Sequence, residues 1–92
     1  MRKRGRTDGN QDDIVKALRA IGCSVAITSA LGDGFPDLLV GRAGFNYLIE
    51  VKDGTQPPSR KALTPDEVDF ADKWRGHISI AMSVDDALRI VA

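Results

Sequence analysis

Two short apolar segments that lie close together in the chain restrict the fold more than any other feature of the sequence. Residues 37–41 read Asp-Leu-Leu-Val-Gly and residues 46–52 read Asn-Tyr-Leu-Ile-Glu-Val-Lys, with only residues 42–45 between them. Short apolar runs bounded by turn residues are typical of strands, and so brief a connection predicts an antiparallel hairpin. Apolar side chains point to both faces of this hairpin, so we expect helices on both sides of the sheet.

The flanking segments predict the other elements. Asn10 is a suitable N-cap for a helix that Gly22 ends, and Thr64, Pro65 and Glu67 form the capping box of a second helix. The expected order is a helix at 11–21, strands at 24–28, 37–41 and 46–52, a loop at 53–60, a helix at 65–75, a strand at 77–82 and a helix after Ser83. The sequence therefore predicts one α/β domain at residues 10–92, with a mixed four-stranded sheet flanked by helices.

Size and composition set the broad class of the protein. Its 92 residues suffice for one hydrophobic core, and 42% apolar residues are too many for a disordered chain. A single cysteine excludes an intrachain disulfide, and no apolar run approaches the roughly 20 residues of a membrane span. We therefore expect a cytoplasmic protein. Because so small a core is marginally stable, we also expect a homodimer.

The formal net charge is zero, but the charges are unevenly distributed. The chain begins with a basic segment at residues 1–9, which we interpret either as a flexible arm that contacts phosphates or as a solubilising tail. An acidic surface between residues 66 and 86 is a candidate docking face for a replication or repair protein. The candidate DNA-binding residues are Arg2, Lys3, Arg4, Arg6, Arg60 and Lys61.

The hairpin brings two carboxylates together. With the turn at residues 43–44, residues whose numbers sum to 87 lie opposite each other, so Asp37 faces Glu50. Directly opposed side chains have Cβ atoms about 5 Å apart on the same face, and like charges in this position destabilise a sheet. Either one carboxyl takes up a proton, or a cation lies between the two. Paired oxygen ligands of this kind suit Mg²⁺ or Mn²⁺.

Lys52 follows Glu50 by two residues, so its side chain leaves the same face of the strand. A lysine there could position an attacking water or offset the charge that develops on a phosphate. A bound metal ion beside a fixed lysine ammonium group is a suitable arrangement for hydrolysing phosphodiester bonds. A Glu-x-Lys sequence alone is common on strand surfaces, whereas its register with Asp37 on an apolar hairpin indicates a functional site.

Phe35-Pro-Asp37 followed by Glu50-Val-Lys52 resembles the signature of the PD-(D/E)xK nuclease superfamily, and more narrowly the small stand-alone VRR-NUC domains of phages and bacteria. The resemblance covers nearly the whole chain. It implies the restriction-endonuclease-like αβββαβα core, with Asp37 and Glu50 as metal ligands and Lys52 as the catalytic lysine.

The resemblance also implies further site residues. The main-chain carbonyl of Val51 would be a third metal ligand, and the opening helix would supply a further acid, which matches Asp13. The alternative for Asp13 is that it complements the helix dipole. Glu67 stands where the family often has a glutamine, but its capping box explains it without a catalytic role.

The function that the resemblance implies is Mg²⁺- or Mn²⁺-dependent endonuclease activity on DNA, with branched, Holliday-junction-type substrates cut by a homodimer in DNA repair. The alternative is a nucleic-acid-binding module of the same fold that does not turn over, or that requires a partner protein.

Four other side chains have structural interpretations. We expect Asp33 to form a turn between two glycines and His77 to play a structural or solvent-facing role. Trp74 is expected in the core, and Cys23 as a small buried residue.

Overall fold

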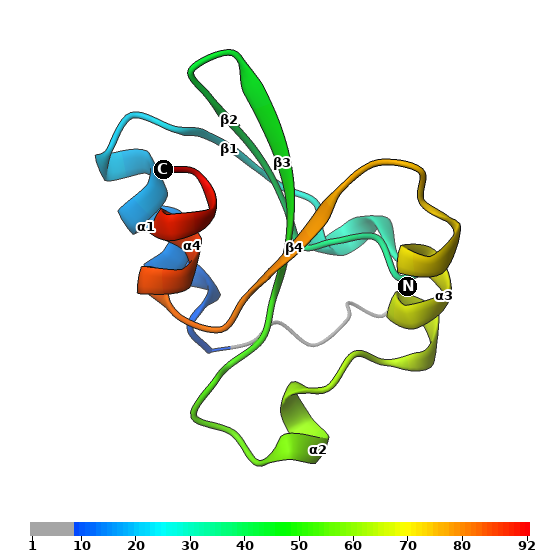
Figure 1. Ribbon diagram of the computed structural model, residues 1–92. Coiled ribbons are helices and arrows are strands. Elements are labelled where there is room, and N and C mark those ends of the chain that lie inside the picture. Colours follow the sequence, from blue (N-terminus) through cyan, green and yellow to red (C-terminus); the bar gives the residue numbers. More distant parts are fainter. Residues whose placement is uncertain (1–8) are drawn as a thin grey trace.

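The computed structural model describes residues 9–92, which form an α/β fold with a mixed four-stranded sheet flanked by helices (Figure 1). The strands lie in the order β1-β2-β3-β4; β1, β2 and β3 are antiparallel, and β4 pairs with β3 in parallel. The elements are α1 (Gln11–Ala20), β1 (Ser24–Ile27), the 3-10 turn η1 (Ser29–Leu31), β2 (Leu38–Arg42), β3 (Phe45–Val51), α2 (Pro58–Lys61), α3 (Pro65–Lys73), β4 (Ile78–Ala81) and α4 (Val84–Ile90).

The central hairpin has the predicted register. Leu38 pairs with Ile49 and Leu39 with Leu48, and the strands are joined by a two-residue turn. The turn residues Ala43 and Gly44 both have positive φ, 51° and 85°, as a type I′ turn requires. This turn fixes which residues oppose each other along the strands, and so it fixes the position of the carboxylates at the far end of the hairpin.

The hydrophobic core lies on one face of the sheet, beneath α1 and α4 (Figure 1). The hairpin side chains on this face have no exposed surface, and Ile14 and Leu18 of α1 are equally buried against them. Burying side chains of this size stabilises the fold by about 1.5–3 kcal/mol each. Cys23 joins this core, as predicted. The fully buried hairpin residues are Leu38, Val40, Ile49 and Val51.

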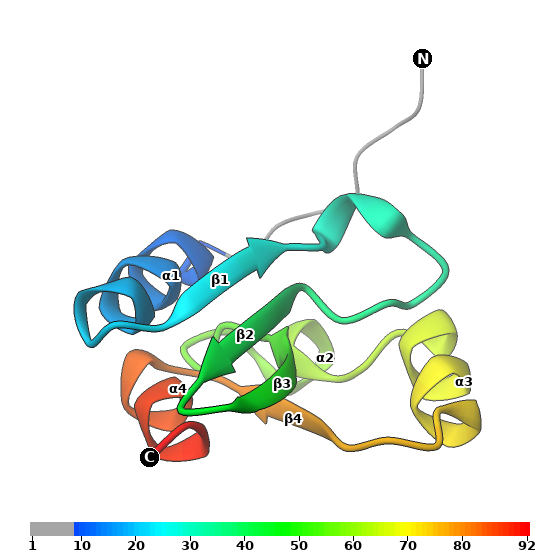
Figure 2. The same ribbon diagram turned by 90° about the horizontal axis from the view of Figure 1, so that it is seen from above.

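The opposite face of the sheet is only partly covered, by α3, so helices do flank the sheet on both sides as expected, but the cover on this side is incomplete (Figure 1). Leu39 and Ile80 on this face are 39% and 41% exposed. Helix α3 lies on the side of the sheet away from α1 and α4, and none of its residues is buried (Figure 2).

Local predictions needed three corrections. Residues 53–60 are not all loop, because Pro58 occupies the first turn of the short helix α2. Asn10 does precede α1, but its side chain does not cap the helix; it donates hydrogen bonds to the carbonyl oxygens of Lys52 and Met82. Trp74 is not a core residue, since it is 42% exposed.

The predictions for the basic start lie outside the described residues, because they concern Arg2, Lys3, Arg4 and Arg6. Within residues 9–92, no helix has the length and apolar character needed to cross a membrane.

Candidate active site

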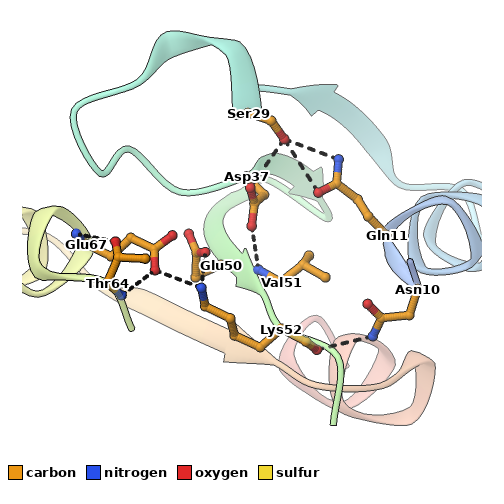
Figure 3. A network of polar contacts seen from close by, with 9 residues as sticks. All are labelled: Asn10, Gln11, Ser29, Asp37, Glu50, Val51, Lys52, Thr64 and Glu67. Carbon is orange, nitrogen blue, oxygen red and sulfur yellow. Dashed lines mark hydrogen bonds and ion pairs between the residues drawn. The ribbon is translucent and has the colours of Figure 1, made fainter. Parts of the chain in front are cut away.

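Asp37 lies immediately before β2, and its carboxylate is held from two sides (Figure 3). Oδ2 accepts a hydrogen bond from the backbone N–H of Val51 at 2.8 Å, and Oδ1 accepts one from the Ser29 hydroxyl at 3.3 Å. Thr28 N–H also donates to the Asp37 carbonyl at 2.7 Å. The carboxylate is therefore fixed between the segment before it and strand β3.

Glu50 lies on β3 beside Asp37 and is 4% exposed. Burial is the main cause that raises the pKa of Glu50 to about 10, and hydrogen bonds with Glu67 and Asp37 and the charges of both add to it. At neutral pH the carboxyl therefore carries a proton. Proton uptake by Glu50 would therefore accommodate the opposed acids when no cation lies between them.

Lys52 lies between two acids. Its Nζ is 2.8 Å from Glu67 Oε1 and 3.6 Å from Glu50 Oε2, and the residue is only 6% exposed. Its backbone is also fixed, because its N–H donates to the carbonyl of Ala81 and its carbonyl accepts from Asn10. The ammonium group is thus held on the same face of β3 as Glu50.

Glu67 has two roles, of which the sequence indicated only one. The capping box is confirmed, since Thr64 and Glu67 exchange side-chain and backbone hydrogen bonds at the start of α3. The same Oε1 atom also accepts a hydrogen bond from Lys52. Burial would raise the pKa of Glu67, but hydrogen bonds from Glu50, Lys52 and Thr64, together with the charge of Lys52, lower it. The capping explanation was correct but incomplete.

Gln11 and Ser29 belong to the site although they were not predicted to be part of it. Gln11 Nε2 donates to Ser29 Oγ at 3.2 Å, and Ser29 in turn reaches Asp37 (Figure 3). Gln11 is 3% exposed at the first position of α1. It lies on the same apolar side of the helix as Ile14, Val15 and Leu18. A polar residue on that side was the one feature of the sequence that could have indicated Gln11 as a site residue. Ser29 had no such signal.

The structure does not bring Asp13 to this site. Asp13 is exposed on α1, and the buried side chain of that turn is Gln11. Within residues 9–92, no three histidine, cysteine, aspartate or glutamate side chains form a group that could hold a metal ion. The main-chain group of Val51 that contacts Asp37 is its N–H; a role for its carbonyl stays a prediction.

A cleft of about 390 Å³ opens in front of these residues, between the sheet, η1, α2 and the start of α3. Asp37, Lys52 and Glu67 line one part of it, and Arg60 of α2 lines another. The predicted DNA-binding residue Arg60 therefore faces the site, whereas Lys61 donates a hydrogen bond to the carbonyl of Gly54.

The donor set fits a hard divalent cation. Asp37 and Glu50 supply carboxylate oxygens side by side, and Mg²⁺ commonly takes one or two carboxylates and keeps several waters. A cation would also offset the repulsion between the two carboxylates, of which Glu50 is buried and Asp37 is partly buried. Comparisons with protein-family profiles, curated proteins and solved structures gave no match.

Proposed function

We propose that this protein is a Mg²⁺- or Mn²⁺-dependent DNA endonuclease of the PD-(D/E)xK superfamily, of the VRR-NUC type. The observation that carries the proposal is the pair of Asp37 and the buried Glu50, with the ammonium group of Lys52 fixed beside it. Directly opposed acids destabilise a sheet unless a proton or a cation offsets their repulsion, and a lysine ammonium group held beside a metal site is suited to phosphodiester hydrolysis.

The order of the elements supports the proposed restriction-endonuclease-like core. Apart from η1 and α2, the chain runs helix, three strands, helix, strand and helix, which is the αβββαβα order. The acids lie at the end of the hairpin remote from its turn, and Asp37 lines the cleft.

Each side chain has a defined task in this proposal. Asp37 and Glu50 would hold the metal, which when bound polarises a phosphoryl oxygen and lowers the pKa of water. Val51 N–H and Ser29 keep the Asp37 carboxylate oriented, and Glu50 releases its proton when it becomes a ligand. Lys52, positioned by Glu67, donates to the phosphate or to the attacking water.

The proposed substrate is branched DNA of the Holliday-junction type, and the proposed assembly is a homodimer. Two strands require two sites, and a domain of this size offers little surface for DNA. Arg60 at the cleft is the described residue best placed to contact a phosphate next to the scissile one.

Cleavage assays on duplex, flap, fork and four-way junction DNA test the proposal. Mg²⁺ and Mn²⁺ should support cleavage and EDTA should stop it. Asp37→Asn should abolish activity and also the thermal stabilisation by Mn²⁺, because the shared site is lost. Lys52→Ala should slow cleavage by about 100-fold while DNA affinity is kept.

Asp13→Asn is the matched control, since it removes an exposed acid that does not line the cleft, and it should retain activity. Cleavage that survives Asp37→Asn would overturn the proposed site. DNA binding without cleavage under any metal would instead favour the alternative, a binding module without turnover or one that requires a partner protein.

A further inference from the structure

A second concave site lies on the partly covered face of the sheet, beside the cleft. It is a groove of about 360 Å³ between the hairpin and the end of α3. Among residues 9–92, no aspartate, glutamate, lysine or arginine lines it. Its lining residues are Phe35, Leu39, Asn46, Leu48, Trp74 and His77.

Trp74 is the main aromatic surface of this groove. Phe70 stacks on its ring at a centroid distance of 5.2 Å and an interplanar angle of 18°, and Phe35 meets it edge-on at 6.3 Å. The indole is nevertheless 42% exposed. An aromatic ring that is held by neighbouring rings and remains partly exposed can serve as a platform for another flat ring.

The groove is a direct neighbour of the catalytic cleft. Leu39 and Leu48 lie two residues from Asp37 and Glu50 on the same strands and the same face, a separation of about 7 Å. Phe35 lines both the cleft and the groove. A nucleotide whose phosphate lies in the cleft would therefore have its base within reach of the groove.

The cleft and the groove differ in the same way as the two parts of a nucleotide, a charged phosphate and an uncharged base. The cleft presents Lys52 and Arg60, which complement an anionic phosphate. The groove presents an aromatic surface, an imidazole and the Asn46 amide, and no charged side chain of the described residues lines it, which suits an uncharged base. Its aromatic platform suits stacking, and the exposed amide of Asn46 offers a donor and an acceptor to a base edge.

We propose that this groove binds an unpaired nucleobase of the DNA strand whose phosphate occupies the cleft, with the base stacked on Trp74. The inference rests on the proposed function and names its substrate class more narrowly. A base inside an intact duplex cannot reach the groove without leaving its stack, so the site favours DNA with an unpaired nucleotide at the point of cleavage.

Trp74 is the only tryptophan in the chain, so intrinsic fluorescence reports on the groove directly. The wild-type protein in EDTA, which prevents metal-dependent cleavage, is titrated with a single-stranded oligonucleotide and with an abasic oligonucleotide of the same length. The abasic strand keeps the phosphates and lacks the bases. The single strand should quench Trp74 strongly, and the abasic strand should bind with little quenching.

Variants then separate the groove from the rest of the surface. Trp74→Ala should weaken single-strand binding at least about fivefold, as expected for the loss of one stacked base, and should affect the abasic strand little. Trp74→Phe should restore part of the affinity, because it keeps a ring beside Phe70. Ile21→Ala, which truncates a similarly exposed apolar residue after α1, should leave binding unchanged.

The outcomes distinguish this inference from the proposed function. If both strands quench Trp74 equally, or if both bind without quenching it, the groove does not bind a base. The nuclease proposal would remain intact. Base-dependent quenching in a protein whose cleavage survives Asp37→Asn would keep the groove and overturn the proposed active site. Trp74 fluorescence that changes on dilution without DNA would mean that a second copy of the chain covers the groove, and would reject the base site.

Discussion

Glu50 couples the proposed site to the stability of the whole protein. Its pKa of about 10 in the folded state, against 4.5 ordinarily, means that the folded protein keeps this proton over a range in which the unfolded chain has lost it. The free energy of unfolding of the metal-free protein should therefore fall as pH rises between these values. The slope is at most about 1.4 kcal/mol per pH unit. Glu67, with a lowered pKa, acts in the opposite sense, and only at pH values below this window.

Glu50→Gln should remove most of this pH dependence, because an amide cannot titrate. In EDTA its free energy of unfolding should be nearly constant from pH 6 to 9 and should exceed that of the wild type at pH 8. Urea denaturation at several pH values measures both. Asp12→Asn, an exposed acid on α1, serves as control and should keep the wild-type slope. An unchanged slope in Glu50→Gln would refute the assignment of the proton to Glu50.

Ser29 and Gln11 should act on the metal through Asp37. Ser29→Ala leaves Asp37 Oδ1 without this donor and Gln11 Nε2 without its acceptor. Loss of such supporting hydrogen bonds typically lowers metal affinity or activity 10- to 100-fold. We expect a decrease of that size in Mn²⁺ affinity, measured by thermal shift against metal concentration.

The conservative variant tests whether the hydroxyl is responsible. Ser29→Thr keeps the donor and should bind Mn²⁺ nearly as the wild type does. If Ser29→Ala and Ser29→Thr lose affinity equally, the effect is one of packing in η1, and the Ser29 hydroxyl does not position Asp37.

Among the elements, the hairpin turn is strained at one residue. Ala43 adopts a φ of 51°, a left-handed conformation that costs a non-glycine residue about 1 kcal/mol. Ala43→Gly should therefore stabilise the protein by about 0.5 kcal/mol, partly offset by the entropy of the glycine in the unfolded chain. Gly44→Ala should destabilise it by about 1 kcal/mol, because φ is 85° there and no atom lies within 4 Å to add a clash.

Urea denaturation of the two variants gives the measurement. Opposite signs are expected, and two destabilised variants would contradict the type I′ geometry. Because the turn is remote from the cleft, Ala43→Gly should leave Mn²⁺ binding unchanged.

Helix α3 connects the two proposed sites. Its first turn places Glu67 against Lys52, and Trp74, directly after its last residue, lines the groove. The loop before β2 approaches the start of α3 closely at Gly34. A Cβ atom at residue 34 would collide with the backbone of Asp66. The position of α3 thus determines both where the Lys52 ammonium group lies in the cleft and where Trp74 lies in the groove.

The whole molecule has a core on one face of its sheet only, and it exposes several large apolar side chains outside the groove. A protein of 92 residues with this distribution gains stability by association. We expect a homodimer at micromolar concentration, observable by light scattering across a dilution series. A monomer at every concentration would contradict the predicted dimer. The physical argument that one assembly cuts both strands of a junction would then fail. The exposed side chains are Ile27, Leu31, Phe45 and Val68.

Local patterns in the sequence determined the order of the main elements, the register of the hairpin and the capping box of α3. These depend on interactions between residues close in the chain, such as the turn at Ala43 and Gly44 or the bonds between Thr64 and Glu67. The approach of Asp37 to Glu50 follows from that register, so the centre of the candidate site could also be predicted.

Only the tertiary structure decided what surrounds this centre. Glu67 reaches Lys52 across 15 positions, Gln11 reaches Ser29 across 18, and Asn10 reaches Lys52 across 42. Such contacts depend on where α1 and α3 pack against the sheet, which no local pattern specifies. The same packing left Asp13 exposed and Trp74 in an open groove. Helical periodicity tells which side of a helix is apolar, whereas what that side meets depends on the burial of the whole chain.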